Sequence, residues 1–282
     1  MAKTIIEQPE VREFFAGGVE RPRNPEAERY FLLISEKHRG RWGAGEVNPV
    51  REEMAGPSLA AQEVKAKAFS LGANLVGITT VTQDHVYQGK EVPERYLISL
   101  AMEMDFGRMA TAPSLGSGAE AARVYYELGE VTIRLAEYIR SIGYHAYAHH
   151  PLGAGRMVQV PYAIAVGLGE QGRNGILVTP QYGCRVRLAA VTTDLPLATD
   201  RPQQWGIGAF CEKCQRCFRA CPAGAIPAQR SLDRGISHYV IHWEKCRPYF
   251  DAQYSCAICI KVCPFSRRPD ARFLDKVAAL KG

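Results

Sequence analysis

Features that would place this chain in a membrane or outside the cell are absent from its 282 residues. No run of eighteen apolar residues occurs, so no membrane-spanning helix is expected. The N-terminal stretch MAKTIIEQPEVREFF has neither an apolar core nor a twin-arginine pair, so it does not have the pattern of an export signal. A cytoplasmic location is therefore expected, although an exported form that had lost its leader would read the same.

Cysteine is almost missing from the first 210 residues, where Cys184 stands alone. The other eight cysteines lie between residues 211 and 263. A disulfide scaffold would spread its cysteines through a short secreted chain, whereas gaps of two and three residues indicate metal binding. Cys184 is expected to pack as a small apolar residue.

The clustered cysteines form two runs with iron–sulfur spacing. The first run is C-x2-C-x2-C-x3-C-P, and the second repeats its last three cysteines after one that lies further upstream. The cysteines are Cys211, Cys214, Cys217 and Cys221 in the first run, and Cys246, Cys256, Cys259 and Cys263 in the second. This spacing lets successive thiolates reach the corners of one cubane, and the proline keeps the turn from curling back.

In two-cluster ferredoxin modules the fourth cysteine of each run ligates the other cluster, which predicts a crossed assignment. The first 4Fe-4S cluster then takes Cys211, Cys214, Cys217 and Cys263, and the second takes Cys221, Cys246, Cys256 and Cys259. Structural zinc also uses sets of four cysteines, but two interleaved runs that each end in Cys-Pro argue against it. Cys246 departs most from the usual pattern, because nine residues separate it from Cys256 in place of the usual short gap.

Basic residues are concentrated in the same part of the chain. From Trp205 onward there are 13 Lys and Arg against 6 Asp and Glu, in a chain whose net charge is +6. This excess could be a solvated surface, a patch for an acidic redox partner or a site for nucleic acid. We favour compensation of the negative charge that the clusters and their thiolates carry.

The residues before the cysteines mix helical and strand patterns, which predicts an α+β fold. We expect an irregular N-terminal arm over 1–57, a domain over 58–200 and an iron–sulfur domain over 201–282, joined by a linker at 194–204. Helices are predicted from Ser58 to Gly72, from a Ser117–Glu120 capping box to Gly143, and over 158–166. Strands are predicted over 74–81, 96–102, 175–180 and 186–194.

Three short motifs invite functional assignments. GLGEQG (167–172) matches the dinucleotide fingerprint, but it follows a predicted helix and precedes a strand, the reverse of the required order. Its glycine-rich turn, with Arg173 and Asn174, could still cradle a phosphate or an amide-bearing edge of a cofactor. DHVYQG (84–89) has the wrong spacing for a cobalt-binding histidine, and the paired histidines of AHHPLG (148–153) are interpreted as a polar loop.

Residues 60 to 265 resemble the cobalamin-dependent reductive dehalogenases. The resemblance lies in AMEMDF, TAPS, LAEYIRSIGYHAY, FCEKCQRCFRACPAGAI and, above all, PYAIAVGLGEQGRNGILVTPQYGCRVRLAAVTTDLPL. It implies a nitroreductase-like cobalamin-binding domain, a bacterial-ferredoxin-like domain with two 4Fe-4S clusters, and base-off cobalamin without a histidine ligand. It also implies a small organic, possibly organohalide, substrate and an external electron donor such as ferredoxin or flavodoxin.

The resemblance further implies the roles of individual residues. A tyrosine on the long helix protonates the substrate carbon; this is Tyr125, with Tyr126 as the alternative. A basic residue in GCRVRL stabilises its anion, Arg187 being preferred over Arg185, because a phenol of ordinary pKa near 10 otherwise donates its proton poorly. The expected cofactor contacts are Gly167, Gly169, Gly172, Arg173, Asn174 and His150. The loop after GYHAY is about three residues longer than the family pattern, so the substrate stays open.

Two other functions remain open from the residues. An enzyme similar to epoxyqueuosine reductase would use the same cofactors on tRNA, and the basic C-terminal part would suit phosphate contacts. However, no aspartate lies within 143–170, where that family places its acid, and no helical repeats follow the clusters. An electron-transfer or corrinoid-carrying protein without catalysis would explain the clusters but not the large domain that precedes them.

Overall fold

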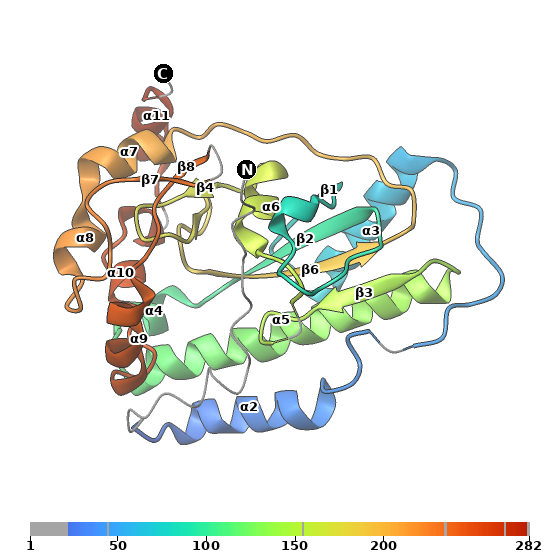
Figure 1. Cartoon of the computed structure of the whole chain (residues 1–282), viewed down its shortest axis with the longest axis horizontal. Coiled ribbons are helices and arrows are strands. Elements are labelled where there is room, and N and C mark those ends of the chain that lie inside the picture. Colours follow the sequence, from blue (N-terminus) through green and yellow to red (C-terminus); the bar gives the residue numbers. More distant parts are fainter. Residues whose placement is uncertain (1–21, 44, 154, 234–235, 268, 281–282) are drawn as a thin grey trace.

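A four-stranded antiparallel sheet lies at the centre of the computed structural model, which describes residues 22–43, 45–153, 155–233, 236–267 and 269–280. Its order is β1 (Leu75–Thr80), β2 (Tyr96–Glu103), β6 (Val186–Thr193) and β3 (Ala146–His149). With the helices around it, the sheet confirms the mixed helix and strand fold that the sequence predicts (Figure 1). In the described residues no helix is long and apolar enough to cross a membrane.

Helices cover both faces of the sheet. Its central strands, β2 and β6, are therefore buried on both sides. The long helix α5 (Leu115–Ser141) and α3 (Pro57–Leu71) share one core with Met102 of β2. The adjacent Ala101 points the other way and packs with Ala163 of α6 (Gln159–Ala165), as alternation along a strand requires. The predicted ends of these helices hold to within a few residues.

The start of α5 differs from the sequence prediction. The capping box joins Ser114 and Ser117, not Ser117 and Glu120. Ser114 has extended backbone, its hydroxyl accepts from the backbone N–H of Ser117, and the helix therefore begins three residues earlier than expected. Glu120 is buried inside the helix instead, where it accepts from the N–H of Asp105 and from Arg123.

The expectation of an irregular N-terminal arm is wrong for residues 25–37, which form α2 (Pro25–Lys37). Asn24 caps this helix, and Ala27 and Ile34 are buried as it packs along α5. The consecutive apolar residues YFLLI lack the spacing of an amphipathic helix, which hid the helical pattern. Residues 46–56 then follow the C-terminal end of α5, where Asn48 N–H donates to Arg140 O over 3.0 Å. Residues 1–21 of the predicted arm lie outside the described residues.

Short elements make up the rest of the chain. A hairpin of β4 (Glu170–Gln171) and β5 (Leu177–Val178) follows α6, so the strand predicted over 175–180 is reduced to two residues. After an extended linker come α7 (Ile207–Cys214), α8 (Arg216–Ala220), β7 (Ser231–Asp233), β8 (Ile236–His238), α9 (Trp243–Ala252), α10 (Ile258–Lys261), η2 (Pro264–Arg267) and α11 (Ala271–Ala278). α4 (Phe106–Ala110) and η1 (Gln83–His85) complete the described elements.

Of the cysteine-bearing helices, α9 and α10 lie nearest the N-terminal end of α5, and α10 contacts both α4 and α8 (Figure 1). Lys261 donates to the backbone oxygen of Ala112 over 2.8 Å, which links α10 to the turn before α5. A side chain at Gly118 would lie 2.7 Å from the backbone oxygen of Tyr254. This close approach requires glycine on that face of α5.

Candidate active site

The first predicted set of cysteines meets at one cavity. Cys211, Cys214, Cys217 and Cys263 all line it, together with side chains from the first part of the chain. Cys263 therefore joins three cysteines of the other run, as the crossed assignment requires. Burial raises the pKa of Cys211 to about 12, and the neighbouring thiols of Cys263, Cys217 and Cys214 add to this effect.

The second set is likewise drawn from both runs. Burial raises the pKa of Cys259 to about 12, and the neighbouring Cys256, Cys246 and Cys221 raise it further, as does Cys217 of the first set. The pKa of Cys246 is also raised, first by burial and then by Cys221 and Cys256. Cys221 of the first run thus lies among the cysteines of the second. Thiolates in such surroundings require cations beside them, which bound iron provides.

The arrangement does not suit a single metal ion. Within the described ranges no group of three or more Cys, His, Asp or Glu side chains could hold one ion. Structural zinc needs four donors that meet at one point, whereas the thiolates of a cubane bind separate corners. The two sets, each drawn from both runs, suit the separate corners of two cubanes.

Backbone conformation in the cysteine loops is unusual. Gln215, between Cys214 and Cys217, has a φ of 54°, and the four residues 254–257 around Cys256 all have positive φ. Left-handed backbone is costly for residues other than glycine and concentrates at functional sites. Both loops therefore hold a costly backbone conformation that packing alone does not require. This is consistent with cysteines that ligate a cluster.

The GLGEQG segment and the turn after it hold the cysteine region in place. Glu170 accepts from the backbone N–H groups of Gly206 over 3.0 Å and Gly208 over 2.7 Å, at the start of α7. Arg173 is buried and donates to the backbone oxygens of Cys211 over 3.2 Å and Glu212 over 3.1 Å. Sequence reasoning assigned no role to Glu170, although a carboxylate near the N-terminus of a helix is stabilising there.

The glycines and Asn174, predicted as cofactor contacts, lie in this same segment. A Cβ at Gly167 would meet Arg201 O at 2.9 Å, and one at Gly169 would meet Val178 O at 2.2 Å. A Cβ at Gly172 would press on the Asn174 carboxamide at 2.8 Å. These glycines permit close packing of the hairpin, while Arg173 and Asn174 line the cavity of the first cysteine set. A contact with cobalamin stays a prediction for all five residues.

Tyr125 and Arg187 come together as a pair from α5 and β6. The guanidinium carbon of Arg187 lies 4.6 Å from the centre of the Tyr125 ring. The Nε of Arg187 is buried and has no hydrogen-bond partner among the described residues. The pair therefore combines a phenol with a guanidinium whose Nε–H group has no acceptor among the described residues.

Arg185, the second candidate, lies elsewhere. It is fully buried, forms an ion pair with Glu103 at 2.7 Å and donates to Ser266 O over 2.6 Å. It also donates to the backbone oxygen of Met104. These contacts join the end of β2 to the segment after Cys263. Of the two arginines, Arg187 is the one beside Tyr125.

The paired histidines do not form a polar loop, because both are buried. His149 lies 2.9 Å from Thr192 Oγ1, and burial lowers its pKa to about 3. Burial also lowers the pKa of His150 to about 3; its Nε2 lies 3.0 Å from His38 Nδ1. His38 stacks on Tyr126, with ring centres 4.9 Å apart. The sequence interpretation failed because the partner, His38, is 112 residues away.

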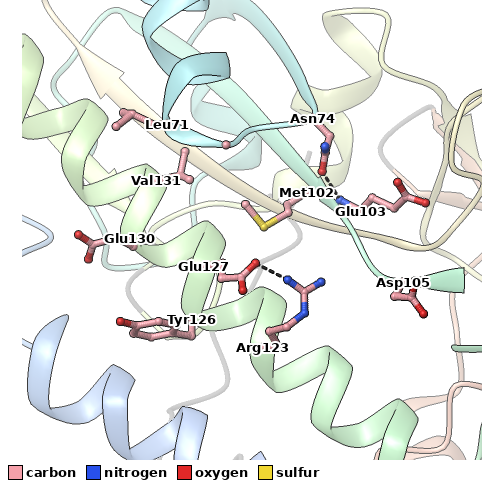
Figure 2. A pocket seen from close by; sticks show the side chains of 11 residues that line it. Leu71, Asn74, Met102, Glu103, Asp105, Arg123, Tyr126, Glu127, Glu130 and Val131 are labelled. Atoms are coloured by element: carbon pink, nitrogen blue, oxygen red, sulfur yellow. Dashed lines mark hydrogen bonds and ion pairs between the residues drawn. The ribbon is translucent and has the colours of Figure 1, made fainter. Parts of the chain in front are cut away.

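A cavity of about 550 Å³ beside α5 was not anticipated from the sequence (Figure 2). Acidic side chains from α5 and the end of β2 line it, and Figure 2 shows Arg123 paired with Glu127. Tyr126 faces this cavity, whereas the ring of Tyr125 lies against Arg187. The two neighbouring tyrosines are thus separated by the geometry of the helix.

Known proteins share both parts of this arrangement. Residues 59–197 match the family model of the reductive dehalogenase subunit, and residues 210–266 match that of the 4Fe-4S dicluster domain. The first match confirms the resemblance of this chain to the reductive dehalogenases. The second match confirms two 4Fe-4S clusters as the cofactors of the cysteine region.

Individual reductive dehalogenases are also similar to this chain. Tetrachloroethene reductive dehalogenase of Desulfitobacterium hafniense is 34% identical over 184 residues, which cover 61% of this chain and 33% of that protein. The enzyme of the same name from Sulfurospirillum multivorans is 33% identical and covers 61% and 35%. This chain thus spans about a third of the length of these relatives.

Solved structures agree. The catabolic reductive dehalogenase NpRdhA, in complex with 3-bromo-4-hydroxybenzoic acid, matches with a TM-score of 0.80 and 26% identity, over 90% of this chain and 40% of that one. Epoxyqueuosine reductase is a more distant relative. The protein from Listeria monocytogenes is 27% identical over 44% of this chain and 33% of its own. A solved epoxyqueuosine reductase, at 20% identity and a TM-score of 0.54, shares the fold.

Proposed function

We propose that this chain carries the catalytic core and electron relay of a cobalamin-dependent reductase that removes halide from a small organic compound. The observation that carries the proposal is the contact between Tyr125 and Arg187. The relatives are named as reductive dehalogenases, and one related structure is described as suggesting a mechanism for B12-dependent dehalogenation. Cobalamin, when bound, would supply the low-potential chemistry that reduces the carbon–halogen bond.

The residues of the chain then have distinct tasks. The Tyr125 hydroxyl donates a proton to the substrate carbon that loses halide, and the charge of Arg187 stabilises the phenolate left behind. The unpartnered Nε of Arg187 leaves one donor free for an anionic group in the site. The eight cysteines hold the two clusters through which electrons arrive.

We infer the domain roles from the same arrangement. Residues 58–200 form the cobalamin-binding domain, of nitroreductase-like fold, and residues 201–282 form the ferredoxin-like domain. Gly167, Gly169 and Gly172, with the buried His150, are proposed to shape the cofactor side of the first domain. An acidic electron donor such as ferredoxin or flavodoxin fits the 13 Lys and Arg found from Trp205 onward. A cytoplasmic location stays part of this proposal.

The experiment is anaerobic reconstitution of the full chain with iron, sulfide and cobalamin, followed by gel filtration and halide release. Retained cobalamin with a base-off absorption spectrum, and halide from tetrachloroethene or 3-bromo-4-hydroxybenzoic acid with a reduced viologen dye, would support the proposal. Cobalamin that does not stay bound would overturn it. Bound cobalamin without halide release from either compound would favour the electron-transfer or corrinoid-carrying function instead.

A tRNA-modifying function is the second candidate, because epoxyqueuosine reductases are also relatives of this chain. The basic C-terminal part could contact phosphates. The same reconstituted protein should be mixed with tRNA at low salt. Salt-sensitive binding together with no halide release would favour this function over dehalogenation.

A further inference from the structure

We propose that Asn174 is an outer contact of the first 4Fe-4S cluster, whose carboxamide donates a hydrogen bond to a cluster or cysteine sulfur and raises the reduction potential of that cluster. The inference rests on the iron–sulfur assignment alone and does not depend on the substrate of the enzyme. It gives the GRNG turn, which the dinucleotide interpretation could not explain, a role in electron transfer.

Asn174 lies at the right place for this contact. Its side chain lines the same cavity as Cys211, Cys214, Cys217 and Cys263. The residue is 6% exposed, and its Oδ1 is buried with no hydrogen-bond partner in the part of the chain that the structure describes. A buried carboxamide left unpaired in this way costs about 1 to 3 kcal/mol, so a partner is expected in the cavity.

A cluster supplies a partner of the required kind. Sulfide and thiolate sulfurs accept hydrogen bonds and carry negative charge, so the amide N–H group must face them. The oxygen and nitrogen of a carboxamide exchange places by a half-turn, which leaves the shape of the side chain unchanged. The amide nitrogen of Asn174 can therefore occupy the place of the unpaired Oδ1 and donate to the cluster.

The neighbouring residues hold Asn174 in this orientation. Arg173 is fixed by the backbone oxygens of Cys211 and Glu212 and lies over the ring of Tyr239, 4.7 Å from its centre. Gly172 leaves room for the carboxamide, because a Cβ there would lie 2.8 Å from Asn174 Oδ1. The turn thus brings a rigid amide from the first domain to a cluster whose ligands lie in the second.

The expected effect follows from the charge of the reduced cluster. Reduction adds an electron to the cluster, and a hydrogen-bond donor stabilises the more negative state. Removing the donor should therefore shift the midpoint potential to a more negative value. We expect about a tenfold lower ratio of reduced to oxidised cluster at fixed potential, which corresponds to about 59 mV for one electron.

The test is an anaerobic redox titration of the full reconstituted chain, followed by electron paramagnetic resonance. Asn174→Leu keeps the branching at Cγ and removes the amide, and the first cluster is assigned by comparison with Cys217→Ser, which alters a ligand of that cluster. Gln171→Leu is the matched control, because Gln171 lies in the same hairpin and bonds Tyr239 but does not line the cavity. The first cluster alone should shift in Asn174→Leu, and neither cluster in the control.

Two outcomes would overturn the inference. One is an unchanged first-cluster potential in Asn174→Leu with full iron content. The other is an equal shift in Gln171→Leu, which would mean that hairpin packing sets the potential. If Asn174→Leu does not assemble its clusters, Asn174→Asp takes its place; its negative charge should lower the potential further, and no shift would again contradict the proposal.

Discussion

The guanidinium of Arg187 lies over the ring of Tyr125, 4.6 Å from the ring centre, and joins the middle of the long helix α5 to strand β6. β6 pairs Arg187 with Met102 of β2, on the face of the sheet that α5 covers. The contact thus depends on register within the sheet and on the rotation of the helix above it. A slip of one residue in either element would separate the pair.

Replacement of Tyr125 tests the proton donor. Tyr125→Phe should keep both clusters and cobalamin and lose turnover by about 10² to 10⁴-fold, the usual contribution of a general acid. Arg187→Gln should also lower turnover, and Arg187→Lys should retain part of it because the positive charge remains. Tyr126→Phe is the control, since its ring stacks on His38 instead. Full turnover in Tyr125→Phe would contradict the assignment of Tyr125 as the proton donor. Loss of turnover in Tyr126→Phe alone would assign that role to Tyr126.

Crossed ligation predicts an unexpected partner for Cys221. Cys221→Ala should disturb the same cluster signal as Cys246→Ala and leave the signal affected by Cys217→Ser intact. The wild-type chain should hold roughly eight irons, and each ligand variant should fall toward roughly four. Cys184→Ser is the control for a neighbouring cysteine that is no ligand: Cys184 lies beside Cys263 and Ser266, and the variant should keep roughly eight irons. Identical spectra of Cys221→Ala and Cys217→Ser would show that each run binds its own cluster.

Glu170 should stabilise the start of α7. Glu170→Gln removes the charge from a carboxylate that accepts from the N–H groups of Gly206 and Gly208. We expect a loss of about 1 to 3 kcal/mol in stability and easier loss of iron from the first cluster. Thermal unfolding and iron release to a chelator measure the two effects. Glu53→Gln, at an exposed position, should change neither, and an equal effect of both variants would contradict the assigned role.

The buried histidines predict a pH dependence of stability. Burial lowers the folded-state pKa of His149 and His150 to about 3, whereas both would have a pKa near 6.5 in the unfolded chain. The unfolded state therefore binds more protons between these values, so stability is complete above pH 6.5 and falls as pH decreases toward 3. Each histidine should contribute a slope of about 1.4 kcal/mol per pH unit.

Urea unfolding between pH 7.5 and 4.5 measures this slope. His149→Asn should reduce the slope by about one histidine's share, whatever its effect on stability at pH 7.5. His242→Asn, at an exposed position, should leave the slope as in the wild type. The same slope in all three proteins would mean that other groups, such as the cluster thiolates, control the response to acid.

Local patterns in the sequence were sufficient for the iron–sulfur cofactor and for most of the secondary structure. Spacing of two and three residues brings neighbouring thiolates toward one cluster, and in the structure Cys263 lines the same cavity as three cysteines of the first run. Apolar residues at gaps of three and four likewise determined the course of α5. The predicted capping box between Ser117 and Glu120 was wrong, because Ser114 and Ser117 can form an equally good capping box one turn earlier.

The long-range contacts could not be predicted from local patterns. α2 was missed because most of its apolar residues form one run, YFLLI, without helical spacing, and only the packing on α5 shows which of its residues are buried. His150 was interpreted as part of a polar loop because its partner, His38, lies on the segment that follows α2. The role of Asn174 at the cavity depends on a turn that brings the first domain to the cysteines of the second.

The sequence by itself thus determined the cofactor class, since ligand spacing along the chain is a local property that folding does not change. It also determined the mixed fold, because hydrophobic periodicity sets which faces are buried. The tertiary structure alone decided which arginine lies beside Tyr125, since Arg187 and Arg185 are two residues apart but contact different partners. Arg185 is held by Glu103 and Ser266, and Arg187 keeps a free donor beside the phenol.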